Sequence, residues 1–351
     1  MKAAYINKTG PPENILHGDV PAPKPGPTQC LVKVSAVALN PVDTYIRGGM
    51  IQMPLPSPFI VGCDLAGTVT EVGPGVTRFE PGDRVWGSNQ GLLGRQGTFA
   101  EYCAVDECWL YPTPDGVADE QAAASALVGI TAHLGLVRDA KLEKGEMIFV
   151  NGGSGGVGST VVQMSKAIGA RVVTTAGSDK KVELCRKLGA DFVINYKTQN
   201  VEVELKRIAP AGVHVWWETQ REPNFDLAVG ALSARGRMIV MAGREARPPF
   251  PVGPFYVKGC SLHGFVMFMA SPEEQQDAAE DINRWLAEGK LKANIDRVMP
   301  LAQAAAAHRL QEESTIGKTG ALSGKIVLKP EPRCCRHLAG RSLCPASCHY
   351  P

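Results

Sequence analysis

The first third of the chain alternates short runs of apolar and β-branched residues with Pro and Gly. Short strands separated by turn residues indicate an antiparallel, barrel-like domain. The pattern therefore predicts a β-rich unit that ends near residue 122. The runs most typical of strands are residues 31–34, 67–72, 82–85 and 99–103.

The pattern changes after this point into helices and strands that alternate. An Ala- and Leu-rich helix is expected over residues 122–137. Short apolar runs bounded by Gly or by charged residues are typical of buried parallel strands, and their alternation with helices predicts a doubly wound sheet. These runs are residues 147–151, 171–175, 192–194, 213–217 and 237–241.

The C-terminal part predicts two amphipathic helices, over residues 272–288 and 301–312. The first has Pro near its start and Gly289 just after its end. A strand over 325–328 is expected to return to the first domain. A chain of 351 residues also exceeds what one core usually supports. We therefore predict an α/β protein with two domains, namely 1–122 completed by 268–330, and 123–267.

Charge and hydropathy exclude some classes of partner. The 37 Lys and Arg residues and 35 Asp and Glu residues are spread along the chain, without the basic stripe that nucleic acid requires. No apolar run approaches the roughly 20 residues that span a bilayer, and the N-terminus lacks the apolar core of a signal peptide. A cytoplasmic protein without a membrane or nucleic-acid partner is expected.

Cysteine is distributed in two ways. Cys30, Cys63, Cys103, Cys108, Cys185 and Cys260 are scattered singly, which is typical of reduced thiols. Four more cysteines lie in residues 331–351, a Pro- and Arg-rich segment that predicts a disordered tail. Their spacing around His337 and His349 fits no standard ligand pattern, so no metal site is predicted.

A glycine-rich turn directly follows the expected strand 147–151, and a run of helical periodicity follows the turn. In this position a Gly-x-Gly-x-x-Gly pattern predicts a dinucleotide site. Glycines allow the tight turn, the approach of a pyrophosphate and close helix packing, while the helix N-terminus attracts the anion. The candidate contacts are Gly153, Ser154, Gly155, Gly156, Val157 and Gly158.

The end of the second parallel strand indicates which nucleotide is preferred. NAD sites usually place a carboxylate on the ribose here. This chain has Gly177 and Ser178 instead, and no carboxylate until Asp179. Ser178 and Lys181 offer a hydroxyl and a cation to a 2′-phosphate. The sequence therefore favours NADPH over NADH.

These segments together resemble the medium-chain dehydrogenase/reductase superfamily, and within it the quinone oxidoreductases related to zeta-crystallin. The resemblance covers about residues 1–330 and is most specific over residues 40–47, 62–67, 97–102 and 153–166. It implies a GroES-like β-barrel catalytic domain, a Rossmann domain, a cleft between them for NADPH, and a homodimer.

The resemblance also implies roles for single residues. It places Asn40, Asp43 and Tyr45 beside the nicotinamide and the substrate carbonyl. Tyr196 joins Ser178 and Lys181 at the 2′-phosphate. The remaining implied cofactor contacts are Thr131, Gly177, Gly243 and Phe265.

Zinc-dependent relatives have Cys at the position of Asn40 and His at the position of Cys63, with four closely spaced cysteines after the first strands. This chain has neither set. At most one soft ligand remains, which is too few for a catalytic zinc with three protein ligands. A zinc-free reaction is therefore expected.

Two loops depart from the family pattern. Residues 215–220 carry Trp216 and Trp217, which must face opposite sides of a strand, so that at most one can line the cleft. Residues 244–249 begin with Arg244, which is a candidate for recognising an acidic or polar substrate group. Substrate choice depends on both loops.

The favoured function is hydride transfer from NADPH to a small quinone or enone, with Tyr45 and Asn40 donating hydrogen bonds to the oxygen that becomes anionic. One alternative is an enoyl-thioester reductase of the same superfamily, which needs a longer channel. Another is a non-catalytic NADPH-binding protein, as some zeta-crystallin relatives are.

Overall fold

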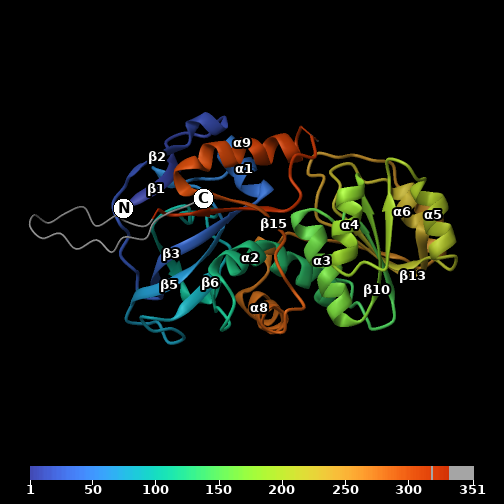
Figure 1. Ribbon diagram of the computed structural model, residues 1–351, viewed down its shortest axis with the longest axis horizontal. Helices are drawn as coiled ribbons and strands as arrows, with labels where there is room; N and C mark the ends of the chain where they lie inside the picture. Colours follow the sequence, from blue (N-terminus) through green and yellow to red (C-terminus); the bar gives the residue numbers. More distant parts are fainter. Residues whose placement is uncertain (318, 332–351) are drawn as a thin grey trace, which may run out of the picture.

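The computed structural model describes residues 1–317 and 319–331. The predicted tail, with its cysteines, lies outside the described residues except for Glu331. Figure 1 shows two lobes side by side, with the N-terminal strands at one end and the parallel sheet at the other.

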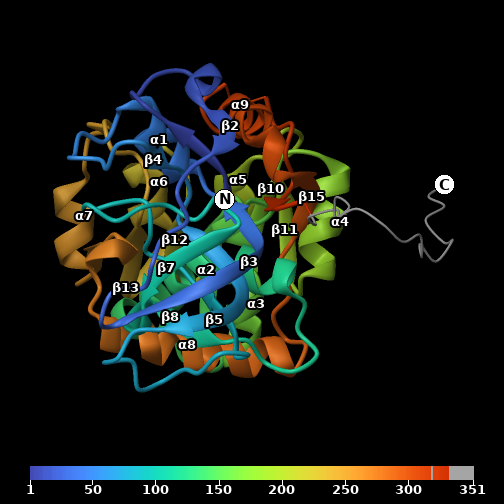
Figure 2. The ribbon, with the colours of Figure 1, turned by 90° about the vertical axis from the view of Figure 1, so that its left-hand side faces the viewer.

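The N-terminal lobe is built on a seven-stranded sheet in the order β15-β16-β3-β5-β6-β8, and β7 pairs with β3. A three-stranded sheet in the order β2-β1-β4 lies beside it. Figure 2 shows β3, β5 and β8 at the end of this lobe. The strands are β1 Lys2–Ile6, β2 Leu16–Asp19, β3 Gln29–Leu39, β4 Phe59–Ile60, β5 Asp64–Val72, β6 Arg84–Gly87, β7 Tyr102–Asp106, β8 Leu110–Pro112, β15 Ile295–Pro300 and β16 Lys325–Lys329.

The second lobe is a six-stranded parallel sheet in the order β11-β10-β9-β12-β13-β14. The order reverses between β9 and β12, and in open α/β sheets the crevice at such a point receives the ligand. The predicted doubly wound sheet is confirmed. Its strands are β9 Met147–Asn151, β10 Arg171–Ala176, β11 Phe192–Asn195, β12 Val213–Glu218, β13 Leu232–Val240 and β14 Ser261–Gly264.

Helices lie on both faces of the parallel sheet (Figure 1), and α2 and α9 pack on β3 and β16 of the N-terminal lobe. Helix α2 contacts β3, β5, α3 and α8, so it joins the two lobes. The helices are α1 Pro41–Gly48, α2 Asp119–His133, α3 Gly156–Ile168, α4 Asp179–Lys187, α5 Val201–Ile208, α6 Phe225–Ala231, α7 Val252–Val257, α8 Pro272–Ala287 and α9 Ala304–Thr315. A π-helical turn, η3 Leu134–Asp139, continues α2, and 3-10 turns occur at η1 Pro12–Asn14, η2 Glu107–Trp109, η4 Met267–Met269 and η5 Leu301–Gln303.

The strand expected at 325–328 does return to the first lobe, where β16 pairs antiparallel with β3. The strands expected at 82–85 and 99–103 begin two and three residues later, at Arg84 and Tyr102. No apolar run predicts β14, because only Leu262 is strongly apolar in this short edge strand. The exact domain boundaries stay a prediction.

Trp216 and Trp217 face opposite sides of β12, as predicted. Trp216 packs on Phe149 with ring centroids 4.3 Å apart, whereas Trp217 belongs to the core cluster that α2 shares with the N-terminal lobe. Both rings are buried. Neither lines the cavity described below, so the two indoles stabilise the sheet rather than shape the pocket.

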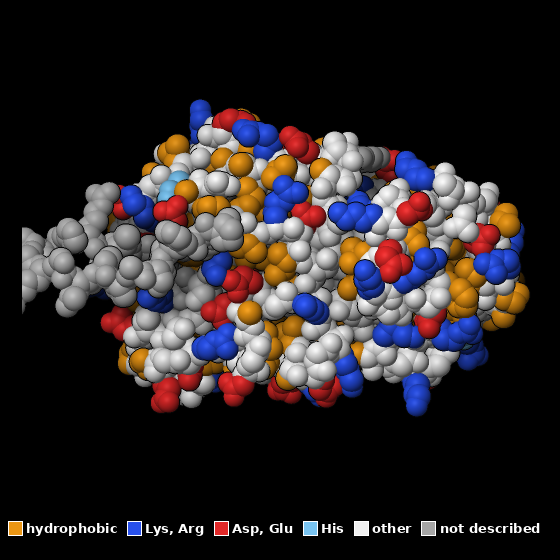
Figure 3. All heavy atoms as spheres, in the orientation of Figure 1, with side chains coloured by type: hydrophobic (Ala, Val, Ile, Leu, Met, Phe, Trp, Pro, Cys, Tyr) orange, Lys and Arg blue, Asp and Glu red, His pale blue; other side chains and the backbone are white. Residues whose placement is uncertain are grey.

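Figure 3 shows basic and acidic side chains interspersed over one face of the molecule. No helix among residues 1–317 and 319–331 is long and apolar enough to cross a membrane.

Candidate active site

A cavity of about 590 Å³ opens at the junction of the two lobes. Its walls come from segments far apart in the sequence: the start of α1, helix α2, the glycine-rich turn, the ends of β12 and β13, and the last turn of α9. Predicted site residues that line it are Asn40, Tyr45, Thr131, Gly155, Gly156, Val157, Gly158, Gly243 and Phe265. The cavity therefore unites two of the three candidate catalytic residues, Asn40 and Tyr45, with most of the predicted cofactor contacts.

The glycine-rich turn connects β9 to α3, and its glycines have different tasks. A Cβ on Gly158 would lie 2.0 Å from the backbone oxygen of Gly152, and a Cβ on Gly153 would lie 2.2 Å from Thr174 Oγ1. These two glycines allow α3 to pack against the sheet. A Cβ on Gly155 would meet nothing within 4 Å. The space over Gly155 is thus open to a pyrophosphate at the N-terminus of α3.

The end of β10 forms a second candidate contact region, outside the cavity. Ser178 caps α4, and its Oγ accepts the backbone N–H of Lys181 at 3.4 Å. The Tyr196 ring, at the end of β11, lies against Gly177, where a Cβ would be 2.3 Å from the tyrosine hydroxyl. The three residues predicted for the 2′-phosphate end, Ser178, Lys181 and Tyr196, are therefore brought together around Gly177.

The carboxylate nearest to this region is already bound. Asp179 Oδ1 accepts a hydrogen bond of 3.1 Å from the side-chain amide of Asn195. The ammonium of Lys181 donates to the backbone oxygen of Gly320 at 3.2 Å, so segment 319–324 approaches the same region. A hydroxyl, a phenol and an ammonium remain as groups for an additional phosphate.

Asn40 and Asp43 form a capping box at the start of α1. Asp43 accepts the backbone N–H of Asn40 at 2.7 Å, and Pro41 follows at the first helical position. Asp43 lies beneath Asn40 and does not line the cavity. Burial raises the pKa of Asp43 to about 7, against the effect of hydrogen bonds from the Cys63 thiol and the Asn40 backbone.

Asn40 belongs to a buried polar cluster that the sequence did not indicate. Its Nδ2 donates to Asp64 Oδ2 at 2.8 Å and to the Ala38 oxygen at 3.3 Å, and its Oδ1 accepts from Lys325 Nζ. Asp64 also accepts from Ser88 Oγ at 2.7 Å. Both hydrogens of the Asn40 amide are therefore engaged, which leaves Tyr45 as the predicted donor with a free hydroxyl hydrogen.

Lys325 is the main member of this cluster that sequence reasoning missed. It begins β16 and is 4% exposed, and its Nζ lies 3.8 Å from Asp64 Oδ2. Burial lowers the pKa of Lys325, while Asp64 and Asp43 act in the opposite direction. The available signal was a lysine directly before the apolar run 326–328, which also fits an exposed strand end.

Tyr45 reaches the cavity from α1, and Arg221 reaches it from the loop after β12. The Arg221 guanidinium carbon lies 5.9 Å from the centroid of the Tyr45 ring. Burial raises the pKa of the Tyr45 hydroxyl, and the Arg221 charge opposes this shift. The phenol is therefore protonated at neutral pH and can donate a hydrogen bond. Arg244, predicted from its loop, also lines the cavity.

The unusual loop after β12 is held by a buried carboxylate. Both carboxylate oxygens of Glu218 accept from Asn151 Nδ2, at 2.9 and 3.1 Å, and Oε1 also accepts the Gln220 backbone N–H at 2.7 Å. Thr219 Oγ1 donates to the Asn151 backbone oxygen. The loop that carries Arg221 is thus fixed to the end of β9, next to the glycine-rich turn.

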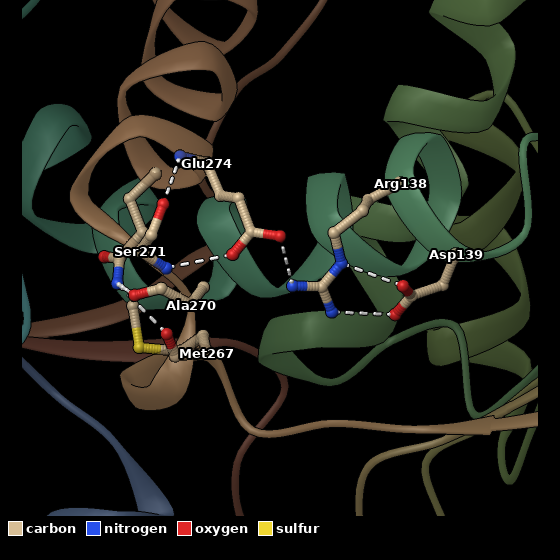
Figure 4. Close-up of polar contacts among 7 residues, drawn as sticks. Arg138, Asp139, Met267, Ala270, Ser271 and Glu274 are labelled. Atoms are coloured by element: carbon tan, nitrogen blue, oxygen red, sulfur yellow. Dashed lines mark hydrogen bonds and ion pairs between the residues drawn. The ribbon is translucent and has the colours of Figure 1, made fainter.

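Phe265 lines the cavity on a segment that leads into α8. Arg138 lies over its ring at 5.4 Å and bridges Asp139 and Glu274, as Figure 4 shows. Glu274 also closes a capping box with Ser271 at the start of α8. These contacts fix the apolar wall of the cavity to η3 and α8.

The cluster around Asn40 does not fit a zinc ion. Among the described residues, no group of three or more His, Cys, Asp or Glu side chains is arranged to hold a metal. The Asn40 carbonyl oxygen is bound to an ammonium, and burial raises the pKa of the Cys63 thiol well above its usual range. A cation among the donors and a protonated thiol both oppose metal binding.

Comparison with known proteins agrees with this geometry. The alcohol dehydrogenase GroES-like domain matches residues 26–115, and the zinc-binding dehydrogenase family matches residues 156–287. Quinone oxidoreductase of Sus scrofa is 34% identical over 332 residues, which cover 93% of this chain and 97% of that protein. The chain belongs to the quinone oxidoreductase family.

One more relative and two solved structures are also similar to this quinone oxidoreductase family member. Trans-enoyl reductase pgmF of Aspergillus terreus is 35% identical over 325 residues and covers 87% of each chain. The Escherichia coli quinone oxidoreductase complexed with NADPH has a TM-score of 0.80 and 26% identity, over 94% of this chain and 100% of that one. An NAD-dependent alcohol dehydrogenase has a TM-score of 0.84 and 32% identity, over 94% and 99%.

Proposed function

We propose that this family member is a zinc-independent reductase that uses NADPH to reduce quinones or other conjugated carbonyl compounds. The observation that carries the proposal is that the glycine-rich turn, Thr131 and Tyr45 all line one cavity. The proposal is supported by relatives that are quinone oxidoreductases and by a structural neighbour that is a complex with NADPH.

In this proposal the residues of the two contact regions hold the nucleotide. Gly155 and the N-terminus of α3 receive the pyrophosphate, and Ser178, Lys181 and Tyr196 receive the 2′-phosphate. When bound, the nicotinamide supplies the hydride. Tyr45 donates a hydrogen bond to the acceptor oxygen, where negative charge develops during the transfer. Asn40 and Asp43 hold the surrounding backbone and side chains in place.

The proposed reaction is tested by following NADPH consumption with a panel of quinones and enones, each repeated with NADH. Turnover with NADPH and a quinone supports the proposal. Tight NADPH binding without turnover on any acceptor would support a non-catalytic role instead.

A second candidate function is reduction of an enoyl thioester. The trans-enoyl reductase relative favours it, and the apolar wall formed by Phe265, Val266 and Met267 suits an acyl chain. Steady-state assays with a quinone and an enoyl thioester at matched concentrations separate the two candidates, because the better substrate has the higher kcat/KM.

We also propose a homodimer that forms along the edge strand β14. Leu262 in this strand and Tyr256 and Val257 in the preceding α7 are exposed apolar side chains on the same end of the parallel sheet. Such groups are typical of association surfaces. Sedimentation of wild type and Leu262→Glu tests this interface.

Cytoplasmic residence stays a prediction, which cell fractionation checks.

A further inference from the structure

Lys325 occupies a position that requires an explanation. Antiparallel pairing places Ile326 opposite Leu39, so that Lys325 comes next to Asn40, where β3 ends and α1 begins. Its side chain is 5% exposed. Lysine is almost never fully buried unless its charge is paired, because transfer of an ammonium from water costs several kcal/mol. Its partners are therefore informative.

The ammonium of Lys325 fixes the orientation of Asn40. An ammonium can only donate and a carboxylate can only accept, so Oδ1 of Asn40 must face Lys325 and Nδ2 must face Asp64. The Ala38 oxygen takes the second Nδ2 hydrogen. The rotamer and the amide orientation of Asn40 are thus determined by the two charges.

The aliphatic stem of Lys325 makes a separate contact with the glycine-rich turn. A Cβ built on Gly156 would lie 3.3 Å from Lys325 Cδ, and both residues line the cavity. One side chain therefore touches the start of α3 in the Rossmann lobe and Asn40 in the catalytic lobe. The start of α3 and Asn40 are far apart in the sequence.

We propose that Lys325 is a positioning residue for the reaction proposed above, on which this inference rests. It holds the Asn40 amide with its oxygen on the Lys325 ammonium and with no N–H left to donate. It also sets the distance between Asn40 and the nucleotide turn. Hydrogen-bond donation to the acceptor oxygen then falls to Tyr45 rather than to Asn40.

Lys325→Met tests this role, because it keeps the aliphatic stem and removes the charge. The matched control is Lys329→Met in the same strand, since Lys329 is exposed and pairs with Glu120. We expect Lys325→Met to lower kcat about 100-fold while the Kd for NADPH changes less than about threefold. The control should stay within about twofold of wild type, and Lys325→Arg should recover part of the loss.

Three results would overturn the inference. One is wild-type turnover in Lys325→Met, and another is a loss confined to NADPH affinity, measured by fluorescence titration. The third concerns the double variant Asp64→Asn with Lys325→Met, in which both buried charges are removed. We expect the double variant to regain thermal stability but not turnover. Full recovery of turnover would show that Lys325 acts only as a counter-ion for Asp64.

The pH profile gives a further readout. The titratable groups that face Lys325 are Asp64, Asp43 and Cys63. Loss of the Lys325 proton would free Asn40, so the alkaline decline of wild-type kcat should begin at a lower pH than in Lys325→Met, in which Tyr45 alone of the two groups can lose a proton. An alkaline decline that persists unchanged in the variant argues against the inference.

Failure of the proposed function can be told apart from failure of this inference. Absence of wild-type turnover with every acceptor contradicts the function alone. The inference is then judged by the crystal structure of Lys325→Met, in which the Asn40 amide is expected to turn away from its wild-type orientation. An unchanged Asn40 would contradict the inference whatever the substrate is.

Discussion

The hydroxyl of Tyr196 lies so close to Gly177 that a Cβ on this glycine would stand 2.3 Å from the phenol oxygen. The two residues come from the ends of neighbouring parallel strands, β10 and β11, where Ala176 pairs with Asn195. Only glycine allows the ring to lie over the strand end. The contact brings the phenol to the same place as Ser178 and Lys181.

This arrangement predicts the basis of nucleotide preference. Lys181→Ala should raise the KM for NADPH about tenfold and leave the KM for NADH nearly unchanged, because one charge-assisted hydrogen bond contributes about 1.5 kcal/mol. Steady-state kinetics with both nucleotides measure the effect. Lys180→Ala, an exposed neighbour, is the control. Equal losses with both nucleotides would exclude a 2′-phosphate contact.

Tyr45→Phe should lower kcat by about 10- to 100-fold and leave NADPH affinity almost intact, because it removes a donor that is needed mainly in the transition state. Stopped-flow reduction of a quinone and fluorescence titration of NADPH measure the two effects. Tyr5→Phe, in β1 and away from the cavity, serves as control. Turnover within about twofold of wild type would remove Tyr45 from the reaction.

Replacement by alanine should have different effects at two glycines of the nucleotide turn, lowering folding stability at Gly158 and NADPH affinity at Gly155. Gly158→Ala places a methyl group 2.0 Å from the Gly152 oxygen, so we expect a loss of about 1–3 kcal/mol of folding stability. Gly155 has φ −78° and open space, so Gly155→Ala should fold normally but bind NADPH about tenfold more weakly. Thermal melts with and without NADPH measure both. Equal melting temperatures for the two apo variants would contradict this assignment.

Asp43 should make stability depend on pH. Burial raises its pKa to about 7 in the folded protein from an ordinary 3.8, so the folded state binds this proton more tightly than the unfolded state. The corresponding stability is fully present below about pH 4 and is lost as the pH rises through 7. Asp43→Asn keeps an oxygen for the Asn40 N–H but cannot ionise. Its melting temperature relative to wild type should therefore rise between pH 5 and pH 8, and parallel curves would contradict the prediction.

Local pattern determined much of the fold. The strand β9, the glycine-rich turn and α3 follow one another without interruption, so β-periodicity, turn chemistry and helical periodicity could each be read within residues 147–168. The edge strand β14 escaped this reading, because two of its four residues are polar and its pairing with β13 is decided by the neighbouring strand.

The sequence by itself therefore determined the alternation of strands and helices, the nucleotide turn, and the absence of a ribose carboxylate after β10. Only the tertiary structure decided that Lys325 is buried beside Asn40, that Arg221 lies over Tyr45, and that Trp216 and Trp217 belong to the core. The physical reason is the separation along the chain over which each kind of interaction acts. Periodicity and turn chemistry act between near neighbours in the chain, whereas the hydrogen-bond partner of the buried Lys325 lies 285 positions away in the sequence.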